Sequence, residues 1–193
     1  MKNNNTFKEY VAPILVLVCI CLVITAALAA TYGVTNPIIE ENTIRSADEA
    51  RAELLPEADT FTEYDGELVV EEKDKVFATE CYIADNGSGM VVTVQSSSFG
   101  GLLTEMIGID SDGAITGVKV TAHEDTPGLG TKAQTPEHLG QYAGLTELQA
   151  TAAKDDSSVS YITGATISSN AVHYGVYCAL DQYKAVKAAG GVQ

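Results

Sequence analysis

The sequence predicts an α+β protein in which a single N-terminal transmembrane helix precedes a domain built on an antiparallel sheet flanked by helices. Three observations predict this. Residues 10–39 form a charge-free apolar stretch long enough to cross a bilayer. Short β-branched runs separated by glycine-containing turns follow between residues 76 and 121. Apolar residues at three- and four-residue steps then predict an amphipathic helix over 169–189.

The composition excludes several classes of protein. With 26 acidic and 11 basic residues the net charge is −15, which excludes nucleic-acid binding because phosphate contacts need clustered Lys and Arg. The four cysteines form no CxxC pair, and the three histidines lack paired spacing, so we expect no metal site. The sequence shows no Ser-His-Asp arrangement that would indicate a hydrolase. We therefore predict no catalytic residue and no metal ligand.

The first element is a transmembrane helix over residues 11–34, preceded by a cytoplasmic N-terminus over residues 1–10. Lys2 and Lys8 precede the helix, and the next cation is Arg45. By the positive-inside rule, the N-terminus lies in the cytoplasm and the following chain lies outside the cell (plasma or inner) membrane.

Two other interpretations of this segment are open. Ala27-Leu28-Ala29 resembles a signal-peptidase site, although the apolar run exceeds the roughly 7–15 residues of a signal peptide. Cys19 lacks the small preceding residues that a lipoprotein anchor needs. Cys19 and Cys21 point to different helix faces, so we expect them to be small apolar residues of the helix and not a metal pair.

The next element is a juxtamembrane helix or linker over residues 40–60, followed by the domain over residues 61–193. Helical spacing of apolar residues predicts a helix from Thr43 to Leu55. Pro56 is expected to end it, because the residue before a proline avoids helical geometry.

The sheet is predicted from four strands: 76–83, 90–94, 103–110 and 114–121. Turn-forming residues 85–89 separate the first two strands, and Ser111-Asp112-Gly113 separates the last two. Asp-Gly readily adopts the positive φ of a hairpin turn. The sheet is therefore expected to be antiparallel and covered on one face by helices.

The last helix, 169–189, is expected to be capped by Ser168, Ser169 or Asn170 and ended by Gly190-Gly191. Cys81 and Cys178 are the only cysteines outside the apolar segment. Both a disulfide between them and two buried thiols are compatible with the sequence.

Two glycine-containing segments stand apart from these elements. His123–Lys132 follows the last strand, and its Pro-Gly and second Gly predict a tight loop that exposes backbone N–H groups to a flat ligand. Thr163–Asn170 precedes the last helix, where first-turn amides and the helix dipole favour an anion. Each segment alone is also compatible with an ordinary turn and helix cap. His123 is compatible with a proton relay and with a hydrogen-bonded histidine at the end of a strand.

Taken together and behind a membrane anchor, these segments resemble the FMN-binding domain family. That family includes the G subunit of Rnf-type ion-translocating ferredoxin:NAD⁺ oxidoreductases and the C subunit of Na⁺-translocating NADH:quinone reductases. The resemblance is carried by Met106–Asp110 with the Asp112-Gly113 hairpin, by His123–Gly130 and by Thr163–Ser169.

The resemblance implies a site for covalent FMN. Thr163-Gly164-Ala165-Thr166 resembles the family's flavinylation sequence, in which a separate flavin transferase joins FMN to the last Thr by a phosphoester bond. This implies that Thr166 is the acceptor. The sequence usually opens with Asp three residues before Thr163, where this chain has Ser160. The predicted flavin-binding residues are Glu124, Thr126, Pro127, Gly128, Leu129, Gly130, Lys132, Thr163, Gly164, Ala165 and Ser168.

The resemblance further implies a membrane-anchored flavoprotein that relays electrons in an Rnf-like complex coupled to Na⁺ or H⁺ translocation. Its implied partners are the other membrane subunits, the flavin transferase and membrane lipid. The length is more similar to the Rnf G subunit than to the quinone-reductase C subunit. The alternatives are that C subunit, a stand-alone extracytoplasmic flavin carrier, and an anchored binding module without flavin.

Overall fold

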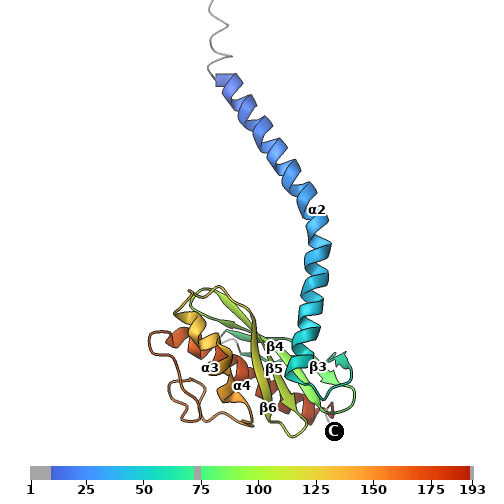
Figure 1. Ribbon diagram of the computed structural model, residues 1–193, viewed down its shortest axis with the longest axis vertical. Helices are drawn as coiled ribbons and strands as arrows, with labels where there is room; N and C mark the ends of the chain where they lie inside the picture. The colour runs from blue at the N-terminus through green and yellow to red at the C-terminus, as the bar shows by residue number, and fades with distance from the viewer. Residues whose placement is uncertain (1–9, 72–74, 192–193) are drawn as a thin grey trace, which may run out of the picture. The chain divides into compact units, whose positions relative to one another are not determined.

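The computed structural model describes residues 10–71 and 75–191 (Figure 1). Within it the chain divides into two compact units, Met1–Ala47 and Asp48–Gln193. The predicted cytoplasmic N-terminus, with Lys2 and Lys8, lies outside the described residues except for Tyr10.

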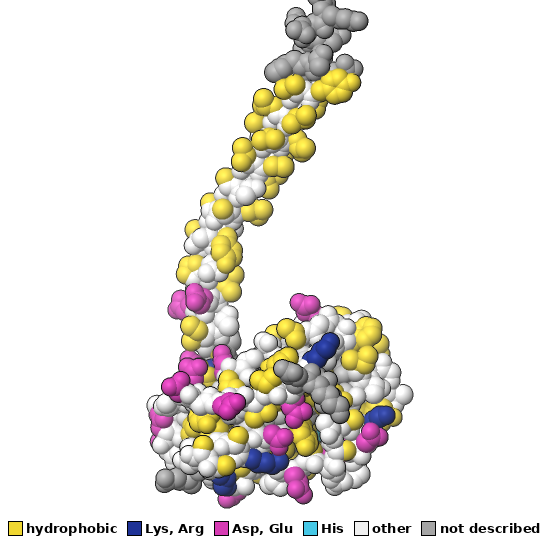
Figure 2. Space-filling model, turned by 180° about the vertical axis from the view of Figure 1, so that it is seen from behind, with side chains coloured by type: hydrophobic (Ala, Val, Ile, Leu, Met, Phe, Trp, Pro, Cys, Tyr) yellow, Lys and Arg dark blue, Asp and Glu magenta, His cyan; other side chains and the backbone are white. Residues whose placement is uncertain are grey.

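The N-terminal helix α2 runs from Ala12 to Leu54. It is long and apolar enough to cross a membrane, and Figure 2 shows hydrophobic side chains along it before the first acidic ones. The sequence predicts two helical segments here, and the structure joins them. Between them only Pro37 opposes a helix, and it removes one backbone hydrogen bond, which costs less than ending and restarting the helix. The helix ends just before Leu55-Pro56, as the proline predicts.

All strands of the sheet pair antiparallel, which confirms the predicted fold class. The strands are β1 Phe61–Glu63, β2 Val70–Glu71, β3 Val76–Ala84, β4 Gly89–Ser97, β5 Leu102–Asp110 and β6 Ile115–Ala122. Their order in the sheet is β1-β3-β4-β5-β6, and β2 also pairs with β3. The first two strands were not predicted, because they are too short to show an alternating pattern.

The predicted hairpin between β5 and β6 is confirmed. Gly113 has a φ of +92°, a conformation that favours glycine. The Asp110 carboxylate accepts hydrogen bonds from the backbone N–H groups of Asp112 and Ala114, at 3.0 and 2.8 Å. The turn thus sets the register of the strand pair that leads into the loop beginning at His123.

One face of the sheet packs against the C-terminal helix α4, Thr166–Ala188 (Figure 1). Alternate strand residues such as Val92 and Ile107 meet Val172 and Val176 of α4 in a fully buried core. Three short helices lie between β6 and α4: η2 Gly130–Gln134, α3 Pro136–Leu139 and η3 Gly140–Tyr142.

The other face of the sheet is also covered, so the prediction of one covered face is wrong. The last turns of α2 place Ala50 and Leu54 against Val91 and Met106, which point away from α4. Gly108 leaves room for Leu54, because a Cβ there would lie 3.1 Å from the Leu54 Cβ. Six consecutive residues of β4, 89–94, are buried, which reflects burial on both faces.

The start of α4 also differs from the prediction. The helix begins at Thr166, and its N-cap is Ala165, which makes no side-chain capping bond. The expected caps are used elsewhere: Ser169 Oγ accepts from Ile162 N–H at 3.0 Å, and Asn170 Oδ1 accepts from Ala153 N–H at 3.1 Å. These side chains hydrogen-bond to the preceding loops instead, so no side-chain cap occupies the N–H groups in the first turn of α4. At the other end, Gly190 has a φ of +81°.

Both cysteines of the domain are free and buried. Burial raises the pKa of the Cys81 and Cys178 thiols to about 12. Of the two arrangements compatible with the sequence, the structure has the buried thiols.

Candidate functional site

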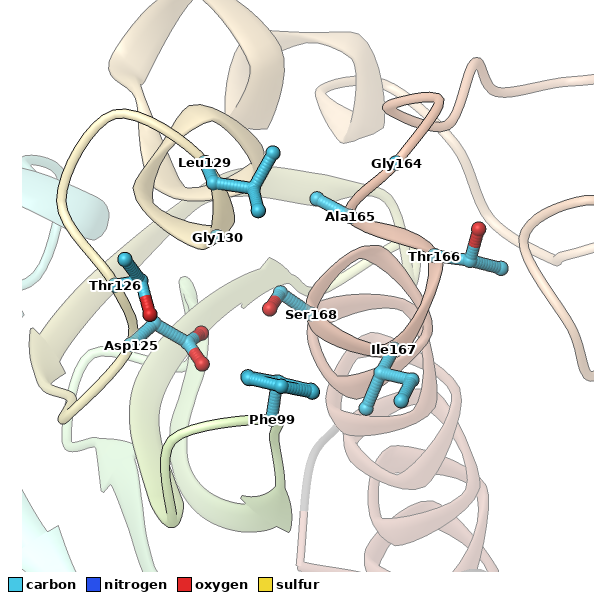
Figure 3. Close-up of a pocket in the computed structure, with 10 residues that line it drawn as sticks. All are labelled: Phe99, Asp125, Thr126, Leu129, Gly130, Gly164, Ala165, Thr166, Ile167 and Ser168. Carbon is cyan, nitrogen blue, oxygen red and sulfur yellow. The ribbon is translucent and has the colours of Figure 1, made fainter.

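A cavity of about 330 Å³ opens where three segments converge (Figure 3). This volume lies within the range of small-molecule sites, roughly 300–1,000 Å³. The segments are the β4–β5 turn, the loop after β6 and the start of α4. The lining residues are Phe99, Asp125, Thr126, Leu129, Gly130, Gly164, Ala165, Thr166, Ile167 and Ser168.

Asp125 ties the β4–β5 turn to the loop after β6. Its side chain is buried, with 4% of the residue exposed. Its carboxylate accepts hydrogen bonds from Ser98 Oγ at 2.6 Å, Gly100 N–H at 2.8 Å and Gln134 Nε2 at 2.6 Å. A buried carboxylate is tolerated only when donors of this kind satisfy it. Asp125 therefore holds two walls of the cavity together.

The loop after β6 is shaped by local contacts. Leu129 N–H donates to Thr126 O at 3.3 Å, and Gly128 N–H donates to Thr131 Oγ1 at 2.9 Å. Gly128 has a φ of +78°, which accounts for glycine at this position. The loop presents Leu129 toward the start of α4 (Figure 3).

Gly130 lets this loop approach α4. A Cβ at this position would lie 2.8 Å from Ser168 Oγ and 2.9 Å from the Asp125 Cβ. Gly130→Ala is therefore expected to destabilise the domain by about 1–3 kcal/mol, the usual effect of overpacking. Urea unfolding measures this loss of stability.

Gly140→Ala is the matched control for this substitution. Gly140 has a helical φ of −59°, and no atom lies within 4 Å of the position of an added Cβ. Its stability is expected to stay at the wild-type level or to rise slightly. Equal behaviour of the two variants would contradict the role given to Gly130.

The start of α4 offers an anion site at the edge of the cavity. Gly164 has a φ of +87°, and Ala165 N–H donates to Ile162 O at 3.0 Å, so the chain turns sharply into the helix. The first helical turn carries unpaired N–H groups and the positive end of the helix dipole. A phosphate is favoured at such a helix start without any cluster of cations.

Thr166 lies at the rim of the cavity. Its residue is half-buried, and in Figure 3 its hydroxyl points away from Leu129 and Thr126. The hydroxyl is therefore directed away from the loop after β6.

Apolar side chains surround the opening of the cavity. Phe99 is 70% exposed, Ile167 54% and Leu129 47%. A cluster of large, exposed apolar side chains at the opening of a cavity is typical of a binding surface. Aromatic and aliphatic walls with a nearby anion site suit a flat ring that carries a phosphate.

The structure brings most of the predicted site residues together. Seven of them line the cavity: Thr126, Leu129, Gly130, Gly164, Ala165, Thr166 and Ser168. The others are outside its lining: Glu124, Pro127, Gly128, Lys132 and Thr163. His123 is exposed and also lies outside the lining.

Three lining residues were not predicted: Phe99, Asp125 and Ile167. Phe99 carries a usable signal, because a phenylalanine between Ser98 and Gly100 in a turn has no core to enter. Asp125 and Ile167 carry none, since an acid in a loop and an isoleucine in a helix are ordinary.

A buried polar network supports the chain that leads to Thr166. His173, on α4, is fully buried; its Nε2 lies 2.8 Å from Ala150 O and its Nδ1 lies 3.3 Å from Tyr142 Oη. Burial lowers the pKa of His173, although the bond to Ala150 and the nearby Asp156 carboxylate oppose this. The imidazole is therefore neutral, with Nε2–H donating to Ala150 O and Nδ1 accepting from the Tyr142 hydroxyl.

Asp156 fixes the same segment. Its carboxylate accepts from the N–H groups of Gln149 at 2.7 Å, Ala150 at 3.1 Å and Ser158 at 2.7 Å. Burial raises the pKa of Asp156, but the hydrogen bonds outweigh burial and hold the pKa below its usual value. The carboxylate is therefore ionised and organises the loop around it.

Comparisons with known proteins agree with this geometry. Residues 99–181 match the FMN-binding domain family, a range that contains all ten lining residues. The G subunit of an ion-translocating oxidoreductase complex from Methanosarcina acetivorans is 33% identical over 92% of this chain and 96% of its own length.

Two further relatives are named by the ion that they translocate. The G subunit of the Na⁺-translocating ferredoxin:NAD⁺ oxidoreductase complex of Acetobacterium woodii is 32% identical, over 88% of this chain and 89% of its own. The G subunit of the proton-translocating ferredoxin:NAD⁺ oxidoreductase complex of Clostridium ljungdahlii is 28% identical, over 84% and 85%.

Proposed function

The chain belongs to the family of G subunits of ion-translocating oxidoreductase complexes and contains an FMN-binding domain. On this premise we propose that it is a membrane-anchored flavoprotein subunit that relays electrons within an Rnf-type ferredoxin:NAD⁺ oxidoreductase. The observation that carries this proposal is the cavity between the loop after β6 and the start of α4, inside the matched range. Its partners are the other membrane subunits of the complex.

The residues of the cavity fit FMN. The N–H groups at the start of α4 suit the phosphate, and Phe99, Leu129 and Ile167 offer apolar surface to the ring. When bound, FMN supplies one- and two-electron exchange. The chain's part would be to bind and orient the ring, with Phe99, Leu129 and Ile167 exposed at the opening of the cavity.

The attachment is proposed to be covalent, through Thr166. A flavin transferase supplies FAD, and the Thr166 hydroxyl oxygen attacks the phosphorus on the flavin side. A phosphoester bond forms, the pyrophosphate bond breaks, and AMP leaves with the hydroxyl proton. The step involves no change of oxidation state. The position of Thr166 in the lining of the cavity, at the start of α4, supports this proposal (Figure 3).

The C subunit of quinone reductases is the alternative within redox chemistry. The Rnf-type assignment is favoured because the three relatives compared above, which span 84–92% of this chain, are all named as G subunits. The names differ in the ion, so Na⁺ and H⁺ are both compatible with the family.

The helix over 12–54 is proposed to span the membrane and to contact its lipid, and the domain is proposed to lie outside the cytoplasm. The charge pattern around the helix supports this orientation. Protease added to intact cells is expected to degrade the domain while a cytoplasmic control protein survives. Protection of the domain until the cells are lysed would overturn the orientation.

The proposed function is tested by expression of the full chain with and without a flavin transferase. With the transferase, the purified protein is expected to absorb in the visible range, to keep this absorbance after denaturation and to bleach on reduction. A colourless protein under both conditions would support an anchored binding module without flavin and would overturn the proposal.

A further inference from the structure

The Gln141 side chain, on η3, forms hydrogen bonds with Ser160, at the start of the segment that leads to Thr166. Gln141 Oε1 accepts from Ser160 N–H at 2.7 Å and from Ser160 Oγ at 2.9 Å. Gln141 Nε2 donates to Ser160 O at 3.1 Å. Both backbone groups of Ser160 are therefore bound by one side chain, in the manner of a strand partner.

The fourth bond of this amide goes to His138. Gln141 Nε2 lies 3.1 Å from His138 Nε2. The amide nitrogen can only donate, so His138 Nε2 accepts and its ring proton is on Nδ1. The Gln141 amide thus uses two donor and two acceptor positions, which is its full capacity. Such a side chain has one orientation.

The element that carries Gln141 is fixed to α4. Tyr142, the next residue, is buried, and its hydroxyl bonds His173 of α4 at 3.3 Å. Gln141 therefore holds Ser160 in place relative to the same helix that begins with Thr166.

The far end of the segment is fixed as well. Ser169 Oγ accepts from Ile162 N–H at 3.0 Å, and Ile162 O accepts from Ala165 N–H at 3.0 Å. Between these bonds, Thr163 and Gly164 are exposed. Residues 160–165 therefore form a short loop, here called the acceptor loop, with both ends tied to the folded domain.

We propose that Gln141 is a positioning residue for flavin attachment: through Ser160 it holds the acceptor loop in the shape that the flavin transferase binds. This rests on the proposed function, in which Thr166 is the acceptor. At position 160 the family's sequence usually has Asp, and Gln141 provides an anchor for the Ser that stands there in this chain.

The role follows from the entropy of binding. An enzyme that binds a loose loop must order it, whereas a loop that is already ordered avoids this cost. Loss of the Gln141 bonds is therefore expected to weaken binding of the acceptor loop and to leave the chemical step unchanged. The transferase KM for this protein is expected to rise about tenfold, equivalent to about 1.4 kcal/mol, with kcat within about twofold of wild type.

The test uses the purified full chain in detergent, FAD and a purified flavin transferase, with attached FMN followed by intact mass. Gln141→Leu removes all four bonds at similar volume. Gln141→Glu keeps the acceptor oxygen for Ser160 and loses the donated bonds, so its KM is expected between wild type and Gln141→Leu. Thermal unfolding verifies that each variant is folded.

Gln149→Leu is the matched control. Gln149 also binds a serine, since Ser157 Oγ donates to Gln149 Oε1 at 2.5 Å, but this pair lies outside the acceptor loop. Its KM is expected to stay at the wild-type value. An unchanged KM in Gln141→Leu, or equal rises in both variants, would overturn the inference. Absence of FMN on the wild-type chain would instead overturn the proposed function.

Discussion

Thr166→Val is expected to abolish covalent FMN while the domain still folds. Valine has nearly the shape of threonine but lacks the hydroxyl that the phosphoester needs. Thr166 is half-buried at the first position of α4, and valine there affects helix stability only slightly. In the part of the chain that the structure describes, the Thr166 hydroxyl has no hydrogen-bond partner whose loss would destabilise the fold. Intact mass and denaturation-resistant absorbance measure the attachment.

Thr126 provides a matched control for this substitution. It lines the same cavity but lies outside the flavinylation sequence. Thr126→Val is expected to retain an FMN adduct, because its hydroxyl is not the acceptor. An adduct on Thr166→Val would refute the assignment of Thr166.

Glu105→Gln is expected to stabilise the domain, and more so at neutral than at acidic pH. Glu105, on β5, is fully buried. Neither carboxyl oxygen has a hydrogen-bond partner among the described residues. The side chain lies against Gly175 of α4, where a Cβ would come within 1.7 Å of its Oε1. Burial raises the pKa of Glu105 well above its ordinary value, so the folded protein holds this group protonated.

The sign of the pH effect follows from proton binding. Above the ordinary pKa of Glu the unfolded chain releases this proton, whereas the folded protein keeps it. The folded state then binds more protons, so this group's contribution to stability is full below the unfolded pKa and is lost as pH rises toward the folded pKa. The free energy of unfolding is expected to fall by about 1.4 kcal/mol per pH unit in this window.

Glutamine cannot ionise, so the variant lacks this loss. Its stability advantage over wild type is expected to grow as the pH rises from about 5 to about 7, measured by urea unfolding. Glu63→Gln, at an exposed position of β1, is the control and is expected to show no such growth. Parallel pH profiles of Glu105→Gln and wild type would contradict a buried protonated Glu105.

The parts of the fold that could be predicted from the sequence are those determined by local patterns. The hairpin at Asp112-Gly113 and the apolar spacing of the last helix depend on neighbouring residues, and the structure has both. The second covered face of the sheet could not be predicted, because it depends on Leu54 meeting Met106, more than fifty residues further along the chain.

The same distinction applies to the site. Thr126–Gly130 and Gly164–Thr166 were predicted from glycine positions and from the resemblance to a flavinylation sequence. Phe99 and Asp125 were not, because their part in the cavity depends on contacts between loops. The start of α4 was predicted three residues beyond its true position, at residue 169 instead of Thr166. Ser169 and Asn170 look like helix caps but accept hydrogen bonds from Ile162 and Ala153 instead.

The proposed function depends on FMN attached to Thr166. Peptide mass mapping of the protein purified from its native membrane measures this attachment. The peptide containing Thr166 is expected to carry the mass of one FMN, less one water, with fragmentation that localises the addition to this residue. A Thr166 peptide at its unmodified mass, or an addition localised to another residue, would contradict it.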